Sequence, residues 1–243
     1  MGDFDGLVVL VTGAAGGIGR AMCETFAAAG ARLALVDVHD SSALARELGP
    51  AHRSWQLDLA DPEAIARTVP EIGAAMGIDV LINNAGLGIV FPAEDLRIED
   101  WEATLAINLR APWLMAAAAL PWLKQSGRGR VVNISSQAGI VAIADHLAYG
   151  ASKAGLNLVT KVLALEWARF GITVNAIAPT VVETPMALVG WSGEKGERAR
   201  AEIPVGRFAR PAEIAAAARY LASAEAAIIT GEVLMADGGF TIR

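Results

Sequence analysis

The segment LVVLVTGAAGGIGR, residues 7–20, joins an unbroken apolar run to a glycine-rich turn and then to a helical pattern. Such a run, bounded by glycine, predicts a buried strand. The glycines allow a tight turn and a close approach of backbone to a bound pyrophosphate, whose charge the free N–H groups at the helix start attract. A purely structural glycine turn remains the alternative.

Six further short runs rich in aliphatic residues alternate with helical patterns along the chain. Most are continuously apolar, which is typical of strands covered on both faces, and the helices between them imply parallel strands joined by right-handed crossovers. Trp55 and Gln56 interrupt only the third run. The sequence therefore predicts an α/β fold, a doubly wound parallel sheet with helices on both faces. The predicted strands are Leu7–Thr12, Arg32–Val36, Arg53–Leu57, Val80–Asn83, Arg130–Ile134, Thr173–Ile177 and Val233–Met235.

Composition narrows the function classes. The 243 residues carry 20 basic and 26 acidic side chains, a formal charge of −6, which argues against nucleic-acid binding. A hydrophobic share of 54% with 19% charged residues excludes disorder, and α/β folds of about 250 residues form one domain, so we expect residues 1–243 to be a single domain. One cysteine, Cys23, and three histidines offer neither a disulfide nor zinc-ligand spacing, so no metal is expected.

Targeting and membrane signals are weak. The N-terminus has no basic region before its first apolar run, and the richest apolar run, Leu114–Leu123, is ten residues long and contains Pro121. A membrane span needs about 20 residues. We expect a cytoplasmic protein without a membrane partner.

Asp37 ends the second predicted strand, 18 residues after Gly19. A carboxylate there can accept hydrogen bonds from an adenosine ribose diol, and it would repel the 2′-phosphate of NADP. The sequence favours NAD over NADP. A helix cap or a solvated turn is the alternative role for Asp37.

The spacing Gly-x-x-x-Gly-x-Gly resembles that of the short-chain dehydrogenase/reductase family, and further motifs follow in the same order over residues 7–239. The resemblance implies a Rossmann-like fold and hydride transfer between a nicotinamide cofactor and an alcohol or ketone. Its implied catalytic residues are Asn108, Ser136, Tyr149 and Lys153. Its implied cofactor-binding residues are Gly13, Gly17, Ile18, Gly19, Asp37, Asp58, Leu59, Asn84, Ala85, Gly86, Tyr149, Lys153, Pro179 and Thr184.

Tyr149 and Lys153, four residues apart, would project from one helix face, and a neighbouring ammonium favours the phenolate form of a tyrosine. The resemblance makes Tyr149 the general acid/base and lets Lys153 hold the nicotinamide ribose. It gives Ser136 the substrate oxygen and Asn108 a water that links Lys153 to solvent. Ser135 is the alternative to Ser136.

One departure from the family pattern follows the sixth strand, where Pro179-Thr180 replaces the common Pro-Gly. A branched side chain there predicts a tighter pocket. Residues 183–205 predict a mobile loop that serves as a substrate lid. The candidate substrate contacts are Gln137, His146 and Trp191, among the apolar residues Leu87, Ile89, Val90, Phe91, Ile140, Val141, Ile143, Met186 and Val189.

Two other functions stay open. A 3-oxoacyl-carrier-protein reductase shares these motifs but generally uses NADPH and basic surface, whereas Phe170 precedes Gly171 here. A catalytically silent nucleotide-binding scaffold would have no chemical need for the four catalytic residues. We expect an NAD-dependent dehydrogenase of secondary alcohols or polyols.

Two predicted helices, 98–123 and 149–170, are apolar on more than one side, so a homodimer or homotetramer is expected.

Overall fold

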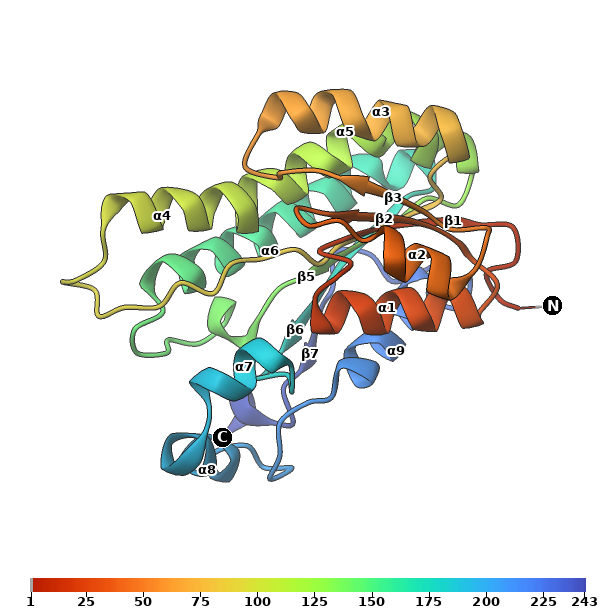
Figure 1. Cartoon of the computed structure of the whole chain (residues 1–243). Helices are drawn as coiled ribbons and strands as arrows, with labels where there is room; N and C mark the ends of the chain where they lie inside the picture. Colours follow the sequence, from red (N-terminus) through yellow and green to blue (C-terminus); the bar gives the residue numbers. More distant parts are fainter. Residues whose placement is uncertain (1) are drawn as a thin grey trace.

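A seven-stranded parallel sheet forms the centre of the protein in the computed structural model (Figure 1). The structure describes residues 2–243, apart from the side chains of 186, 188 and 189. The strand order is β3-β2-β1-β4-β5-β6-β7, which confirms the predicted doubly wound α/β architecture. The strands are β1 (Val8–Thr12), β2 (Arg32–Asp37), β3 (Arg53–Gln56), β4 (Val80–Asn83), β5 (Arg130–Ile134), β6 (Thr173–Pro179) and β7 (Val233–Ala236).

Helices cover both faces of the sheet (Figure 1). One buried cluster joins α1, α2 and α9 to the sheet, and a second joins α3, α5 and α6 to its other face. Burial on both faces explains why β1, β4, β5 and β6 are apolar runs without alternation. The α-helices are α1 (Gly17–Ala28), α2 (Ser42–Leu48), α3 (Pro62–Met76), α4 (Ile98–Leu105), α5 (Ala111–Ser126), α6 (Leu147–Trp167), α7 (Pro185–Gly190), α8 (Gly193–Ala201) and α9 (Pro211–Ala222).

The third strand lies at the edge of the sheet, paired only with β2. Its side chains are half-buried or exposed, unlike those of the central strands. The edge position accounts for the polar interruption at Trp55 and Gln56, because one side of this strand needs no apolar cover.

The order of the strands reverses between β1 and β4. From β1 the chain moves outward to β3, and from β4 it moves the other way to β7. In open parallel sheets the loops diverge at such a point, and ligands bind in the crevice beyond the carboxyl ends of the strands. The glycine turn after β1 and the Asn84–Gly86 segment after β4 lie at this point.

Residues 183–205 are mostly helical, so the prediction of a loop was wrong. The segment forms α7 and α8, beyond the ends of β6 and β7 in Figure 1. Thr184 caps α7 by accepting a hydrogen bond from the Ala187 N–H, and Pro185 occupies the first helical position. Backbone hydrogen bonds between residues 181–183 and Ala209 anchor the base of the segment. Its role as a lid remains a prediction.

A continuous helical stretch, Ile98–Ser126, runs through α4, a π-helical segment η1 (Ala106–Arg110) and α5. Within the described residues, this stretch passes the length and composition test for crossing a membrane. Core helices pass the same test, and α5 packs its Met115 and Leu123 into the cluster beneath the sheet. Helix α5 also contacts α3, so the two helices belong to the layer that covers one face of the sheet.

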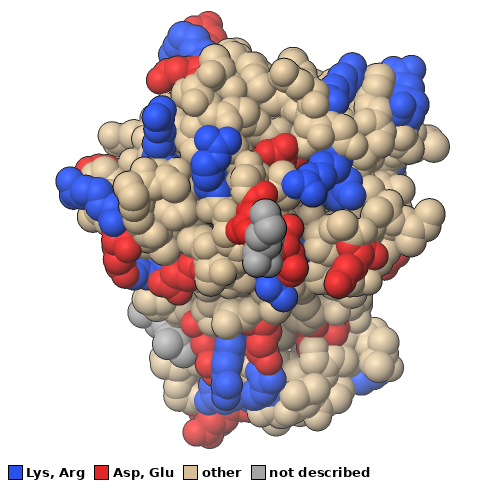
Figure 2. Space-filling model, turned by 90° about the vertical axis from the view of Figure 1, so that its right-hand side faces the viewer, with Lys and Arg blue, Asp and Glu red and all other residues tan. Residues whose placement is uncertain are grey.

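Charges of both signs are interspersed on the face that carries the N-terminus (Figure 2). Elsewhere on the surface, Arg20 pairs with Glu24 and Glu47 at 2.8 and 2.5 Å. These exposed pairs make a mixed surface rather than a basic patch.

Close packing of α3 against α5 generates a test of the fold. A methyl group at Gly73 of α3 would overlap the ring of Trp122 in α5. We expect Gly73→Ala to lower the free energy of unfolding by roughly 1–3 kcal/mol in urea denaturation. The control is Gly190→Ala in α7, which meets nothing within 4 Å and should not destabilise the protein. Equal stability of both variants would contradict this packing.

Candidate active site

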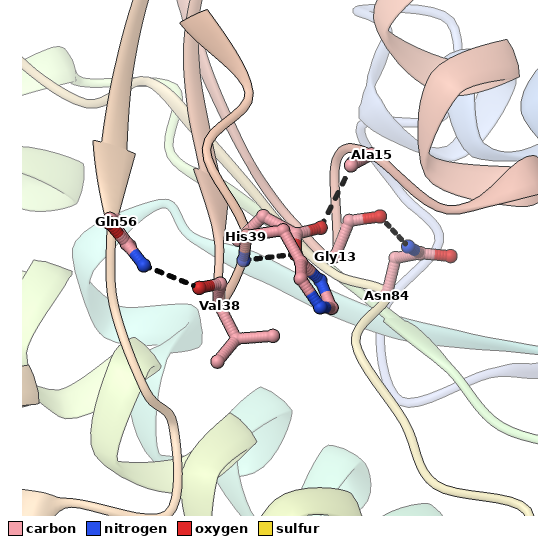
Figure 3. Close-up of polar contacts among 7 residues, drawn as sticks. Gly13, Ala15, Val38, His39, Gln56 and Asn84 are labelled. Atoms are coloured by element: carbon pink, nitrogen blue, oxygen red, sulfur yellow. Dashed lines mark hydrogen bonds and ion pairs between the residues drawn. The ribbon is translucent and has the colours of Figure 1, made fainter.

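The glycine turn after β1 is held to the end of β4 by hydrogen bonds (Figure 3). The Thr12 hydroxyl accepts hydrogen bonds from the Asn84 and Ala85 N–H groups and donates to the Ile82 carbonyl. The Asn84 side chain donates to the carbonyls of Thr12 and Gly13 at 2.9 and 3.1 Å. Two strands distant in sequence thus share one polar junction at the crevice.

Three of the predicted glycines are required by this geometry. Gly13 has φ +64°, which side chains disfavour. A Cβ on Gly19 would overlap the Gly13 carbonyl oxygen, and a Cβ on Gly17 would lie 2.8 Å from the Thr184 methyl group. The turn therefore brings the start of α1 directly against its own strand and against the base of α7. Helix α1 begins without a side-chain cap. Its first backbone N–H groups are therefore available to bind an anion.

Asp37 is the last residue of β2, and its carboxylate is buried beside the glycine turn. One oxygen accepts a hydrogen bond from the Ala15 N–H at 2.9 Å, and the other accepts one from the His39 N–H at 3.0 Å; both donors are labelled in Figure 3. Two accepted bonds leave part of the carboxylate's acceptor capacity for a ribose diol. The carboxylate also fixes the shape of the turn, a role the sequence did not indicate.

Asp58 and Leu59 follow β3 at the neighbouring edge of the crevice. Asp58 is exposed, and its carboxylate accepts a hydrogen bond from the Ala60 N–H at 2.8 Å. The Leu59 side chain is buried in the core cluster. Any contact of Leu59 with a nucleotide would therefore be made by its backbone.

A cavity of about 360 Å³ opens beyond the carboxyl ends of β4, β5 and β6. Residues of the predicted cofactor site, the predicted catalytic site and the α7–α8 segment share its walls. It brings together the predicted residues Ile18, Asn84, Gly86, Ser136, Gln137, His146, Tyr149, Lys153, Pro179, Thr184 and Trp191.

Tyr149 projects from the first turn of α6 into this cavity. Burial raises the pKa of Tyr149 above its ordinary value, and a hydrogen bond with Ser136 opposes that shift. Burial therefore favours the protonated phenol; the predicted effect of Lys153 on the pKa of Tyr149 stays a prediction. Ser135, the alternative to Ser136, also lines the cavity, but its hydroxyl donates to the Lys153 carbonyl at 3.4 Å.

Lys153 is buried one helical turn beyond Tyr149. Its ammonium donates to the Ile134 carbonyl at 2.8 Å and lies 5.7 Å from the centre of the Tyr149 ring. Burial lowers the pKa of Lys153 to about 8. This group is charged at neutral pH and loses its charge in the mildly alkaline range.

Asn108 lies in η1, the π-helical break between α4 and α5, and is fully buried. Its amide oxygen accepts from the Leu87 N–H at 2.8 Å, and its amide nitrogen donates to the Leu87 carbonyl and to the Ser152 hydroxyl. The side chain lies close to Lys153, since a Cβ on Gly86 would come within 3.3 Å of the Asn108 oxygen and 3.6 Å of the Lys153 nitrogen. Asn108 thus supports the loop after β4; the predicted water link to Lys153 stays a prediction.

The substrate end of the cavity is only partly as predicted. His146 lies edge-on to Tyr149, with ring centroids 5.9 Å apart, and its Nδ1 is bonded to the Ala144 carbonyl. Trp191 packs edge-on to Phe208. Of the predicted apolar residues, Leu87, Val90 and Ile143 line the cavity, Ile140 and Val141 line a neighbouring groove, and Ile89 and Phe91 line neither. The side chains of Met186 and Val189 lie outside the described residues.

Two residues of the site were missed by sequence reasoning. Thr12 holds the β1–β4 junction, and Ser152 connects Asn108 to the Tyr149 carbonyl through its hydroxyl. Thr12 carries a usable signal, a hydroxyl between an apolar strand and a glycine turn. Ser152 carries none, because its partner Asn108 is distant in sequence.

Comparisons of the sequence and the fold with known proteins identify relatives of this chain. A family model described as "Enoyl-(Acyl carrier protein) reductase" matches residues 13–241. The chain is 47% identical to D-threitol dehydrogenase of Mycolicibacterium smegmatis, over 98% of this chain and 94% of that protein. It is 43% identical to an NAD-dependent glycerol dehydrogenase of Listeria innocua, over 97% and 94%. A putative NAD(P)-dependent gluconate 5-dehydrogenase of Beutenbergia cavernae, whose structure has NADP at low occupancy, superposes with a TM-score of 0.94 at 36% identity and covers 98% of each chain.

The fold and the site together define an oxidoreductase that uses a nicotinamide cofactor and acts on CH–OH groups. The chain belongs to the short-chain dehydrogenase/reductase family.

The β1–β4 junction yields a prediction about Thr12. Thr12→Val keeps the shape but leaves the Asn84 and Ala85 N–H groups without an acceptor. We expect the free energy of unfolding to fall by about 2–4 kcal/mol, because each unpartnered buried donor costs about 1–3. Thr12→Ser keeps the hydroxyl and should retain most of the stability. If urea titrations gave the two variants the same stability, the hydroxyl would not be what holds the junction.

Proposed function

We propose that this enzyme is an NAD-dependent polyol dehydrogenase that uses Tyr149 as its general acid/base. The observation that carries the proposal is the shared cavity, whose wall brings together Ser136, Tyr149 and the buried Lys153. The two relatives described above as D-threitol and glycerol dehydrogenases support a polyol as the substrate class.

NAD, when bound, would supply the hydride acceptor, and Thr184, Pro179 and Lys153 are the residues that would hold its nicotinamide half. Tyr149 exchanges a proton with the substrate oxygen, which Ser136 orients by a hydrogen bond. The ammonium of Lys153 lies 5.7 Å from the centre of the Tyr149 ring, and a nearby positive charge favours the phenolate form. The positive charge of oxidised NAD acts in the same direction. Together they counter the upward shift that burial gives the pKa of Tyr149.

The choice of NAD rests on Asp37. Its carboxylate is fixed by the Ala15 and His39 N–H groups at the place where an adenosine ribose would lie, and a 2′-phosphate there would meet like charge. The same feature weighs against a 3-oxoacyl-carrier-protein reductase that prefers NADPH.

Removal of the Tyr149 hydroxyl tests its proposed role. Tyr149→Phe should reduce the rate of alcohol oxidation by about 100-fold or more, which is the usual size of a general acid/base contribution. The affinity for NADH, measured by fluorescence titration, should change little. A Tyr149→Phe variant as active as the parent would contradict the assignment.

Replacement of Asp37 tests the cofactor choice. Asp37→Ser replaces the carboxylate by a smaller, uncharged polar group. We expect the ratio of kcat/KM for NAD to that for NADP to fall at least about tenfold, since about 1.4 kcal/mol of repulsion is relieved. Initial rates with each cofactor on one polyol measure this ratio. A parent enzyme that prefers NADP would overturn the choice directly.

Assembly and location are further parts of the proposal. Leu158, Val162 and Leu165 form an exposed apolar stripe at helical spacing on α6, and Trp113 of α5 is also half exposed. An exposed apolar stripe of this kind usually packs against another protein surface. We propose that a second copy of the chain covers α6 in a homodimer or homotetramer, in the cytoplasm and without a membrane or nucleic-acid partner.

Leu165, which is 81% exposed, gives the test of assembly. Leu165→Arg should dissociate the oligomer in sedimentation velocity, because a buried unpaired charge is costly at an interface. The control Lys161→Arg on the same helix retains the charge and should leave the assembly intact. A parent protein that sediments as a monomer would refute the proposal.

A further inference from the structure

Thr180 follows β6 at the edge of the catalytic cavity and is nine-tenths buried. Its backbone N–H donates to the Ala236 carbonyl, but its hydroxyl has no hydrogen-bond partner in the described structure. An unpartnered buried hydroxyl costs about 1–3 kcal/mol, so its presence needs a compensating use.

Gln137 repeats this pattern in the turn that follows the adjacent strand, β5. Its side chain is 6% exposed, it lines the same cavity, and its amide oxygen is buried without a partner in the described structure. It follows Ser136 directly, which places it next to the group that orients the substrate oxygen.

Two segments of the chain carry these side chains to one cavity. Thr180 follows the end of β6, and Gln137 opens the 3-10 turn η2 (Gln137–Gly139), which follows β5, the strand paired with β6. The turn η2 is in contact with β6. Tyr149, Ser136 and both unpartnered groups therefore share the walls of one cavity.

We propose that Thr180 and Gln137 form a specificity site for a second hydroxyl of the substrate, on the carbon next to the one that is oxidised. This inference rests on the proposed alcohol dehydrogenase function and narrows its substrate class to vicinal diols and the polyols that contain them. A hydroxyl is both donor and acceptor, so it can donate to the Gln137 amide oxygen and accept from the Thr180 hydroxyl. A substrate with one hydroxyl leaves both protein groups unpaired.

A site for a second substrate hydroxyl also explains why Pro179-Thr180 replaces the common Pro-Gly pair. A threonine at position 180 narrows the cavity and adds a hydroxyl where the common residue has no side chain. That hydroxyl discriminates between substrates by chemistry as well as by size. Sites that hydrogen-bond a substrate hydroxyl reject the analogue lacking it far more strongly than apolar pockets separate substrates by size.

Thr173 provides a matched control at the opposite end of β6. It is also buried, its hydroxyl is also unpartnered in the described structure, and it does not line the cavity. Thr173→Val and Thr180→Val therefore delete the same group from the same strand in equivalent burial. Neither change removes a protein hydrogen bond, so neither should lower the midpoint of thermal unfolding. Thr180→Ser keeps the hydroxyl and tests whether the hydroxyl alone maintains the substrate preference of the parent.

The experiment compares butane-2,3-diol with butan-2-ol, which differ by the second hydroxyl alone, as substrates with NAD. We expect the parent to favour the diol in kcat/KM by about tenfold or more, the scale of one well-placed hydrogen bond. Thr180→Val and Gln137→Leu should bring that ratio close to one by slowing the diol and sparing the mono-alcohol. Thr180→Ser and Thr173→Val should keep the parent ratio.

Each other result overturns a distinct claim. A parent that oxidises both alcohols equally well, or variants that slow both alike, would overturn the second-hydroxyl site and leave the dehydrogenase function standing. Weaker NADH binding by Thr180→Val in fluorescence titration would assign the hydroxyl to the cofactor instead. A parent that oxidises neither alcohol and no polyol would overturn the proposed function itself, and this site with it.

Discussion

The hydroxyl of Thr12 is the contact on which the active end of the molecule depends. It joins the end of β1 to the end of β4, where the order of the strands reverses, by accepting from two backbone N–H groups and donating to a carbonyl. The loops diverge at this point, and without a fixed junction the glycine turn and the Asn84–Gly86 segment would each be free to shift. Because both segments border the cavity, its geometry follows from this one polar contact between two otherwise apolar strands.

The catalytic groups are arranged so that burial sets the starting protonation and added charge changes it. Burial raises the pKa of Tyr149 and lowers the pKa of Lys153 to about 8, so the phenol keeps its proton while the lysine keeps its charge at neutral pH. A protonated tyrosine is suited to donate a proton to a ketone. Oxidation of an alcohol needs the phenolate, which the lysine and the positively charged form of NAD would stabilise together. The same side chain can therefore serve both directions of the reaction.

Polar groups buried without partners are few among the described residues, and two of them lie together in this cavity. Thr180 follows β6, and Gln137 lies in the turn that follows the paired strand β5. A parallel sheet thus collects side chains from distant parts of the sequence at one edge, and the proposed second-hydroxyl site uses this property.

The amino-acid sequence by itself determined the strands, the glycine turn, Asp37 at the end of β2 and the spacing of Tyr149 and Lys153. These features depend on local patterns, namely continuous apolar runs, glycine conformations and helical periodicity, which a single segment expresses. Only the tertiary structure decided that residues 183–205 fold into helices over the cavity and that Asn108 is engaged by Leu87 and Ser152. It also decided that Thr180 and Gln137 line one cavity, each with a polar atom unpaired in the described structure. Those outcomes depend on which distant backbone and side-chain groups meet after the sheet is assembled. Burial and hydrogen-bond partnership are properties of that assembly, so no local pattern in the chain specifies them.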